Sequence, residues 1–134
     1  MNLNDQGSGV HDSPDGPHYE ALRRGEIHIQ RCDRCGYLRW APAERCPECW
    51  SCEATWTPVE GAGRLWSSTT YRRALHPDFT DVVPYTVGLV NLECGVAMIG
   101  PVPSWQEAPP GTALRAEFRA VDGDVVRLAW VVAQ

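Results

Sequence analysis

The chain has 134 residues, of which 43% are apolar and 9% aromatic, a composition typical of a folded globular domain rather than of a disordered chain. Its 17 acidic residues outnumber its 12 basic ones, which are all arginines, so the formal net charge is −5. This balance argues against a nucleic-acid-binding surface spread over the whole chain. Apolar runs such as residues 128–133 are far shorter than the ~20 residues of a membrane-spanning helix, and the start of the chain lacks the layout of a signal peptide. We therefore expect a cytoplasmic protein with no membrane partner.

The sequence of the first 26 residues predicts a leader followed by a short helix. Residues 1–17 are polar and rich in Asp, Gly and Pro, which predicts a disordered leader. In residues 18–26, Tyr19 and Leu22 have the spacing of one helix face, and Gly25 follows them. One or two helical turns are expected there.

Residues 27–54 contain a cysteine pattern that predicts a metal site. Two Cys-x-x-Cys pairs are separated by ten residues: Cys32, Cys35, Cys46 and Cys49. Such pairs provide four thiolates for a tetrahedral ion, and this spacing is typical of a rubredoxin-like zinc ribbon. Four thiolates leave no open coordination position, so we expect one structural zinc ion. Iron is the alternative metal for such a site, and a disulfide or redox pair is the alternative for the thiols.

The fourth ligand has two candidates. Cys49 and Cys52 form a third Cys-x-x-Cys, so Cys52 could replace Cys49. Pro47 between Cys46 and Cys49 makes this pair the better match to Cys32 and Cys35, and we favour Cys49. Three tryptophans close to the pairs are expected to cover the site: Trp40, Trp50 and Trp56.

The segment around the cysteines is basic. Residues 23–45 hold six arginines and three acidic residues, a local charge of +3. Two interpretations remain open: the arginines neutralise a negatively charged metal–thiolate cluster, or they form an anion-facing patch for a phosphate-bearing ligand or an acidic partner.

Residues 55–134 predict a β domain. Five segments rich in β-branched and aromatic residues have strand-like patterns: 64–74, 83–93, 95–102, 112–120 and 125–132. Gly- and Pro-containing turns separate them, and a five-stranded barrel of this size is commonly an OB-fold. The expected fold class is mainly β, with an N-terminal helix, a zinc ribbon and a C-terminal five-stranded OB-fold barrel.

No catalytic residue can be assigned from the sequence. The chain has no glycine-rich phosphate loop and no Gly-x-Ser-x-Gly elbow, and its four histidines lie in no recognisable catalytic or metal motif. Phe79 is an apolar residue in the polar segment LHPDFTD, a position that often marks a contact surface.

The order of these parts resembles a known family. A short helix with an aromatic residue is followed by the two knuckles in RCDRCG and YLRWAPAERCPEC, by Gly-x-Gly at 61–63 and by the segment PYTVGLVNLECG. This arrangement resembles the domain of unknown function 35 family, whose members are described as zinc-ribbon, OB-fold, acyl-CoA-associated proteins.

The resemblance implies a subunit without catalytic residues that assembles with a thiolase-like enzyme. Members of the family accompany thiolases, polyketide-type acyltransferases and lipid-transfer-protein-type aldolases that shorten steroid side chains. By the same resemblance, the four paired cysteines match the zinc positions, no organic cofactor belongs to this chain, and a CoA thioester is shared with the partner. The regions where partner or acyl-CoA contacts are implied contain Tyr19, Leu22, Phe79 and Tyr85.

Two other functions remain as alternatives. A nucleic-acid-binding OB module needs a basic groove with stacking aromatics, but residues 55–134 carry six arginines and eight acidic residues, a charge of −2. A rubredoxin-like electron carrier would need iron in the cysteine site.

Overall fold

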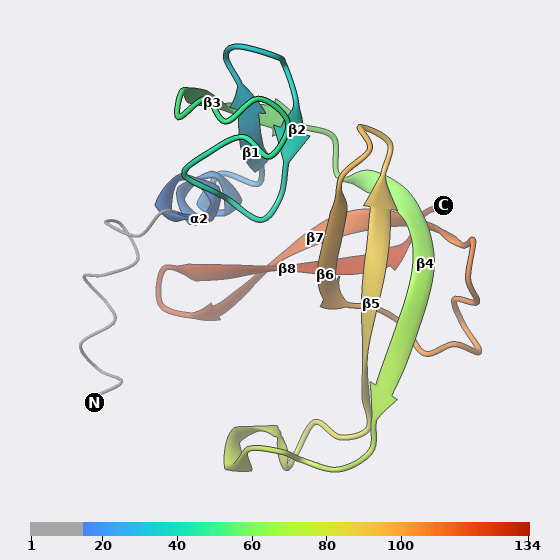
Figure 1. Ribbon diagram of the computed structural model, residues 1–134. Helices are drawn as coiled ribbons and strands as arrows, with labels where there is room; N and C mark the ends of the chain where they lie inside the picture. The colour runs from blue at the N-terminus through green and yellow to red at the C-terminus, as the bar shows by residue number, and fades with distance from the viewer. Residues whose placement is uncertain (1–14) are drawn as a thin grey trace. The chain divides into compact units, whose positions relative to one another are not determined.

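The computed structural model of the protein describes residues 15–134 (Figure 1), so most of the predicted leader lies outside the described residues. The described chain forms two compact units. One contains the residues up to Glu60 together with Phe118–Arg127, and the other contains Gly61–Glu117 and Leu128–Gln134. Within residues 15–134, no helix is long and apolar enough to cross a membrane.

The first unit contains a helix packed against the central strand of a small antiparallel sheet of order β2-β1-β3. Its elements are α2 (Gly16–Arg23), β1 (Ile27–Cys32), β2 (Leu38–Arg39) and β3 (Ala54–Val59). Ala21 and Leu22 of the helix are buried, as are Ile27 and Ile29 of β1. The predicted helix is confirmed, and it buries one apolar core together with β1.

Strand β3 was not predicted from the sequence. It pairs with β1 over the whole length of both strands, from Ile27 opposite Val59 to Cys32 opposite Ala54. Pro58 interrupts the strand-like pattern of this segment, but β3 is an edge strand, where a missing N–H is tolerated. The second half of the ribbon is therefore anchored on the strand that leads into the first cysteine pair.

Most of the predicted five-stranded antiparallel sheet, in the order β6-β5-β4-β7-β8, belongs to the second unit, while residues 118–127 of the β7–β8 hairpin belong to the first. The strands are β4 (Ala62–Tyr71), β5 (Tyr85–Leu92), β6 (Ala97–Pro101), β7 (Ala113–Asp122) and β8 (Val125–Val132). The two edge strands approach each other through side chains: a Cβ atom added at Gly100 of β6 would lie 3.2 Å from the indole of Trp130 in β8. The sheet thus curls around a core that includes Leu65, Val90 and Trp130.

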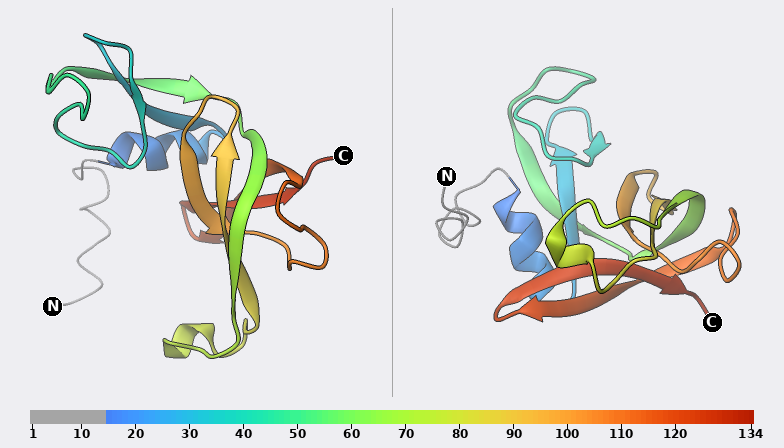
Figure 2. Two further views of the ribbon diagram at one scale, coloured as in Figure 1. Left: turned by 45° about the vertical axis from the view of Figure 1, so that its right-hand side comes forward. Right: turned by 90° about the horizontal axis from the view of Figure 1, so that it is seen from below.

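The hairpin of β4 and β5 carries a long loop at its end (Figure 2). Residues 72–84 connect the two strands and include the short 3-10 helix η2 (Pro77–Phe79). A bulge lies between Leu65 and Ser67 of β4, and bulges increase the local twist of a strand pair. We call residues 71–85 the β4–β5 arm.

Candidate metal centre

The four paired cysteines converge on one point of the first unit. Their Sγ atoms all lie within 4.8 Å of one another, and two distances join the pairs: 3.5 Å between Cys32 and Cys49, and 3.5 Å between Cys35 and Cys46. Sulfur atoms around a tetrahedral zinc ion with bonds of about 2.3 Å are about 3.8 Å apart. The cluster therefore has the composition and size that a tetrahedral metal ion requires.

The two cysteine pairs are held by matching backbone hydrogen bonds. In the first knuckle, the Gly36 N–H donates to Cys32 O at 2.9 Å, and the Cys32 N–H donates to Tyr37 O at 2.9 Å. In the second knuckle, the Trp50 N–H donates to Cys46 O at 2.8 Å, and the Cys46 N–H donates to Ser51 O at 2.9 Å. The knuckles are thus local copies of each other, with Trp50 in the position that Gly36 occupies in the first.

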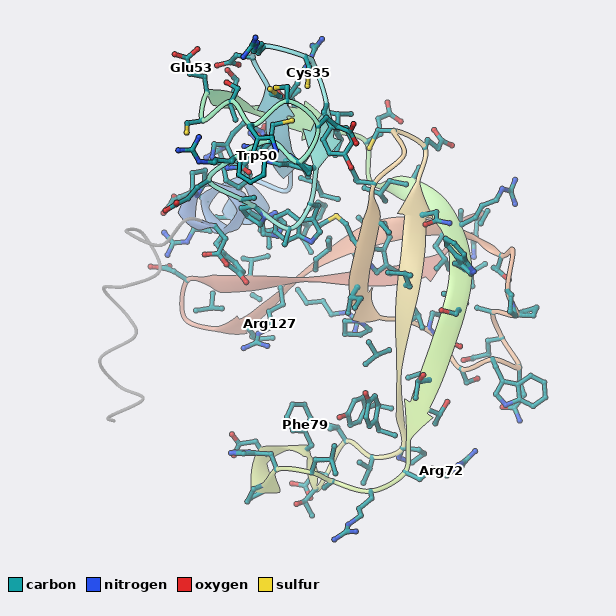
Figure 3. The ribbon with its side chains drawn as sticks, viewed as in Figure 1. Cys35, Trp50, Glu53, Arg72, Phe79 and Arg127 are labelled. Carbon is teal, nitrogen blue, oxygen red and sulfur yellow. The ribbon has the colours of Figure 1, made fainter. Side chains whose placement is uncertain are left out.

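This equivalence explains the backbone of Trp50. Gly36 has φ +79°, and Trp50 has φ +65°, the only positive φ among the non-glycine residues from 15 to 134. The Trp50 side chain is 71% exposed, so the expectation that it covers the metal site is wrong. Figure 3 labels both Trp50 and Cys35 on the ribbon. Trp50 therefore has a backbone conformation that favours glycine. Its exposed side chain gains no burial that would offset the backbone strain.

Trp50→Gly is therefore expected to raise the stability of the first unit by about 1 kcal/mol, because glycine adopts positive φ without a Cβ penalty. Gly36→Ala is the matched change in the other knuckle and should lower stability by a similar amount. A Cβ at Gly36 would lie 3.6 Å from Arg31 Nη2, so no overlap adds to that loss. Urea unfolding of the zinc-loaded chain measures both, and equal signs for the two variants would contradict the equivalence.

Backbone amides prepare the site for anionic sulfur. The Cys35 N–H donates to Cys32 Sγ at 3.5 Å. This hydrogen bond makes the largest contribution, together with that of the Arg34 N–H, to a pKa of the Cys32 thiol that is lowered to about 6. A thiolate is the form that binds a metal ion. The side chains of Cys32 and Cys46 are 1% exposed, whereas that of Cys35 faces solvent, so a bound ion would be shielded from one side and reachable from the other.

Cys52 lies outside the four-sulfur cluster. Its side chain is exposed, and the group of side chains that could hold an ion contains Cys49 instead. The repeated hydrogen bonds of the knuckles give the reason: the second turn closes between Cys46 and Ser51, which places Cys49 as the counterpart of Cys35.

A groove of about 530 Å³ opens beside the first knuckle. Its lining includes Arg31 and Arg34, with Thr55 and Thr57 of β3. The carboxylate of Asp33 accepts a hydrogen bond of 2.6 Å from Thr55 Oγ1. The side of the metal centre that faces solvent is therefore polar and flanked by arginines, which suits both interpretations of the basic segment.

The predicted contact residues Phe79 and Tyr85 meet in the second unit. Their rings are stacked with centroids 5.4 Å apart, and Tyr85 also stacks on Tyr71 at 5.1 Å. Phe79 is 42% exposed, and Leu75 in the same loop is 74% exposed. Figure 3 shows Phe79 on the loop at the end of the β4–β5 arm. The three stacked rings order the base of this long loop. Phe79 and Leu75 nevertheless remain exposed to solvent.

The other two predicted contact residues lie on α2 and differ in exposure. Tyr19 is 39% exposed, whereas Leu22 is 2% exposed and belongs to the core of the first unit. His18, which precedes Tyr19 on the same helix, is buried against Trp40, with ring centroids 4.2 Å apart. Burial lowers the pKa of His18, so the ring is neutral near pH 7 and acts as part of the core.

The three described histidines form no catalytic pair. His18 Nδ1 lies 3.4 Å from the carbonyl oxygen of His28, His28 Nε2 lies 3.0 Å from Glu26, and His76 Nδ1 accepts from the Asp78 N–H. None of these histidines hydrogen-bonds a Ser, Thr or Cys side chain. Within residues 15–134, the four cysteines are the one group of potential metal ligands.

Comparison with known families follows this division of the chain. Residues 20–52 match the rubredoxin-like zinc ribbon domain of ChsH2, and residues 56–119 match the C-terminal OB-fold domain of ChsH2. The chain belongs to the ChsH2 family. The resemblance to the domain of unknown function 35 family is thereby confirmed, and so is the predicted fold class. No curated protein matches the chain in sequence.

Two solved structures share the fold of this ChsH2-type chain. The Ltp2-ChsH2(DUF35) aldolase matches with a TM-score of 0.80 and 24% identity, over 89% of this chain and 94% of that chain. A DUF35-family protein of unknown function from Sulfolobus solfataricus matches with a TM-score of 0.62 and 13% identity, over 98% of this chain and 92% of that chain. The ribbon and the β unit occur together in both.

Proposed function

We propose that this chain is the zinc-binding, non-catalytic subunit of a heteromeric acyl-CoA enzyme whose catalytic subunit is a thiolase-like protein of the lipid-transfer-protein type. The observation that carries the proposal is the fold shared with a chain of the Ltp2-ChsH2(DUF35) aldolase, which extends over nearly the full length of both chains. The name of that structure joins two components, Ltp2 and ChsH2, and we infer that this chain likewise has a partner subunit.

The metal centre supports a structural role within such an assembly. Four thiolates complete the coordination shell of a zinc ion and leave no position for a reactive water. The described histidines are occupied in core and surface contacts. The nucleophile and the acid or base of the reaction would then belong to the partner.

The reaction class we favour is carbon–carbon bond cleavage by retro-aldol chemistry on an acyl-CoA, such as a step in the shortening of a steroid side chain. In this proposal, the CoA thioester lies close to the interface between the subunits. Tyr19, Phe79 and Tyr85 are the side chains proposed to reach the partner or the substrate, and buried Leu22 supports Tyr19 from within the helix.

Co-expression with a candidate thiolase-like partner tests the assembly. We expect the two chains to elute together in size-exclusion chromatography, and we expect aldol cleavage of an acyl-CoA to require the thiolase-like chain. A chain that remains monomeric, and that changes neither the stability nor the activity of the partner, would overturn the proposal. Binding of single-stranded DNA or RNA that weakens with salt would favour the OB-fold nucleic-acid module instead.

Phe79→Ser is expected to weaken the complex at least about tenfold, because aromatic side chains are enriched in protein interfaces and a few anchor residues carry most of the binding energy. Ile99→Ser is the matched control: Ile99 is 69% exposed in the same unit but lies on edge strand β6. The dissociation constant of each variant, measured by titration with the purified partner, separates them. Equal affinity of Phe79→Ser and the unaltered chain would exclude the arm from the interface.

A further inference from the structure

A polar network joins the two halves of the ribbon behind the metal centre. Gln30 lies on β1, two residues before Cys32, and its register partner on β2 is Arg39. Gln30 Oε1 accepts from Arg39 Nε at 2.8 Å and from the Ala43 N–H at 2.9 Å. Arg39 Nη2 donates to the Ala43 carbonyl oxygen at 3.1 Å. Both backbone polar groups of Ala43 are therefore bound by two side chains from the β1–β2 hairpin.

Ala43 lies in the middle of residues 41–45, which we call the link, and Cys46 follows directly. The link has neither helix nor strand, and most of its residues are exposed. Among residues 15–134, the two bonds of Ala43 are the hydrogen bonds that hold the link backbone to the rest of the ribbon. The position of Cys46 relative to Cys32 thus depends on Gln30 and Arg39, because the link alone has no regular structure.

Arg39 also carries a buried charge. Its side chain is 5% exposed, and within residues 15–134 it has no carboxylate partner, while Nη1 has no hydrogen-bond acceptor. A buried cation without a counter-charge is costly. Four thiolates around one divalent ion carry a formal charge of about −2, and the strand register places Arg39 next to the strand that ends at Cys32.

We propose that Gln30 and Arg39 are positioning residues for the metal centre. The pair fixes the link so that the second knuckle is presented to the first, and the metal–thiolate cluster supplies the negative charge that Arg39 lacks. Metal binding and ordering of the link are coupled through this pair. The inference concerns the ribbon alone and does not depend on the proposed partner or reaction.

Arg39→Met tests the proposal, since methionine keeps the apolar stem and removes the guanidinium. Competition with a chromophoric chelator should show an increase of about tenfold in the zinc dissociation constant, the scale expected when a residue that orients metal ligands is lost. Arg72→Met is the matched control, because Arg72 is exposed and lies outside the basic segment around the cysteines, and its replacement removes the same charge. Its zinc affinity should change by less than about threefold.

Three further measurements separate positioning from general loss of stability. Gln30→Ala should raise the zinc dissociation constant by a similar factor, and the double variant should be little worse than either single one, because both act through Ala43. The visible spectrum of bound Co²⁺ should change in both variants. At saturating zinc, the far-ultraviolet circular dichroism of Arg39→Met should match that of the unaltered chain, because the ribbon still folds around its metal ion.

The outcomes that overturn the proposal are distinct. Wild-type zinc affinity in Arg39→Met, or a loss no larger than that of Arg72→Met, would remove Arg39 from the site. Weakened zinc affinity with an unchanged Co²⁺ spectrum in Arg39→Met would make Arg39 an ordinary core residue rather than a positioning residue. If Arg39→Met does not fold, Gln30→Ala with wild-type affinity and a wild-type Co²⁺ spectrum would also reject the network.

Discussion

Cys46→Ser is expected to lose stoichiometric zinc and to unfold the ribbon. The Cys46 side chain is 1% exposed, and its Sγ lies 3.5 Å from that of Cys35, so serine would leave three thiolates and a buried hydroxyl. Structural zinc sites contribute on the order of 10 kcal/mol to folding. The apolar core of the ribbon is too small to replace that contribution. Metal analysis after gel filtration should give about one zinc per unaltered chain and none for the variant.

Cys52→Ser is the matched control for this experiment. It makes the same chemical change close to the site, but Cys52 is exposed and outside the sulfur cluster. Its zinc content and its far-ultraviolet circular dichroism should match those of the unaltered chain. Loss of zinc in Cys52→Ser together with its retention in Cys49→Ser would show that Cys52 is the fourth ligand.

The metal centre could be predicted from the sequence because cysteine spacing encodes its geometry directly. The pairs Cys32/Cys35 and Cys46/Cys49 each form a local turn. The direction of their sulfur atoms is therefore determined mainly by the few residues around each pair. The glycine-like conformation of Trp50 could not be predicted in this way. Large side chains rarely adopt positive φ, and only comparison with the position of Gly36 could have indicated it.

Long-range pairing and burial were harder to predict. Strand β3 is defined by its register with β1, a contact between segments more than 20 residues apart, and Pro58 hides its pattern. From the sequence, Arg39 would be expected at the surface, yet it is buried and donates a hydrogen bond to Gln30. Leu22 shares a helix face with Tyr19 by spacing, but only the packing on β1 shows that one is core and the other is exposed.

The β unit has its own critical position at Gly63. This residue lies in β4 where the strand pairs with β5 on one side and with β7 on the other, opposite Leu92 and Leu114. A Cβ atom there would overlap the carbonyl oxygen of Asn91 and would lie 3.0 Å from the Cα of Leu92. Both are backbone atoms of a paired strand, so they cannot move aside as the end of a flexible side chain can.

Gly63→Ala is therefore expected to lower the free energy of unfolding of the β unit by about 3 kcal/mol or more, because β4 must separate from β5 to admit one methyl group. Gly95→Ala is the control: Gly95 has φ +102° but no atom within 4 Å of an added Cβ. Its cost is backbone strain alone, about 1 kcal/mol. Urea unfolding followed by tryptophan fluorescence compares them. Equal losses would mean that β4 and β5 can part at this point at little cost, and the close backbone approach at Gly63 would then not be what fixes the register of the sheet.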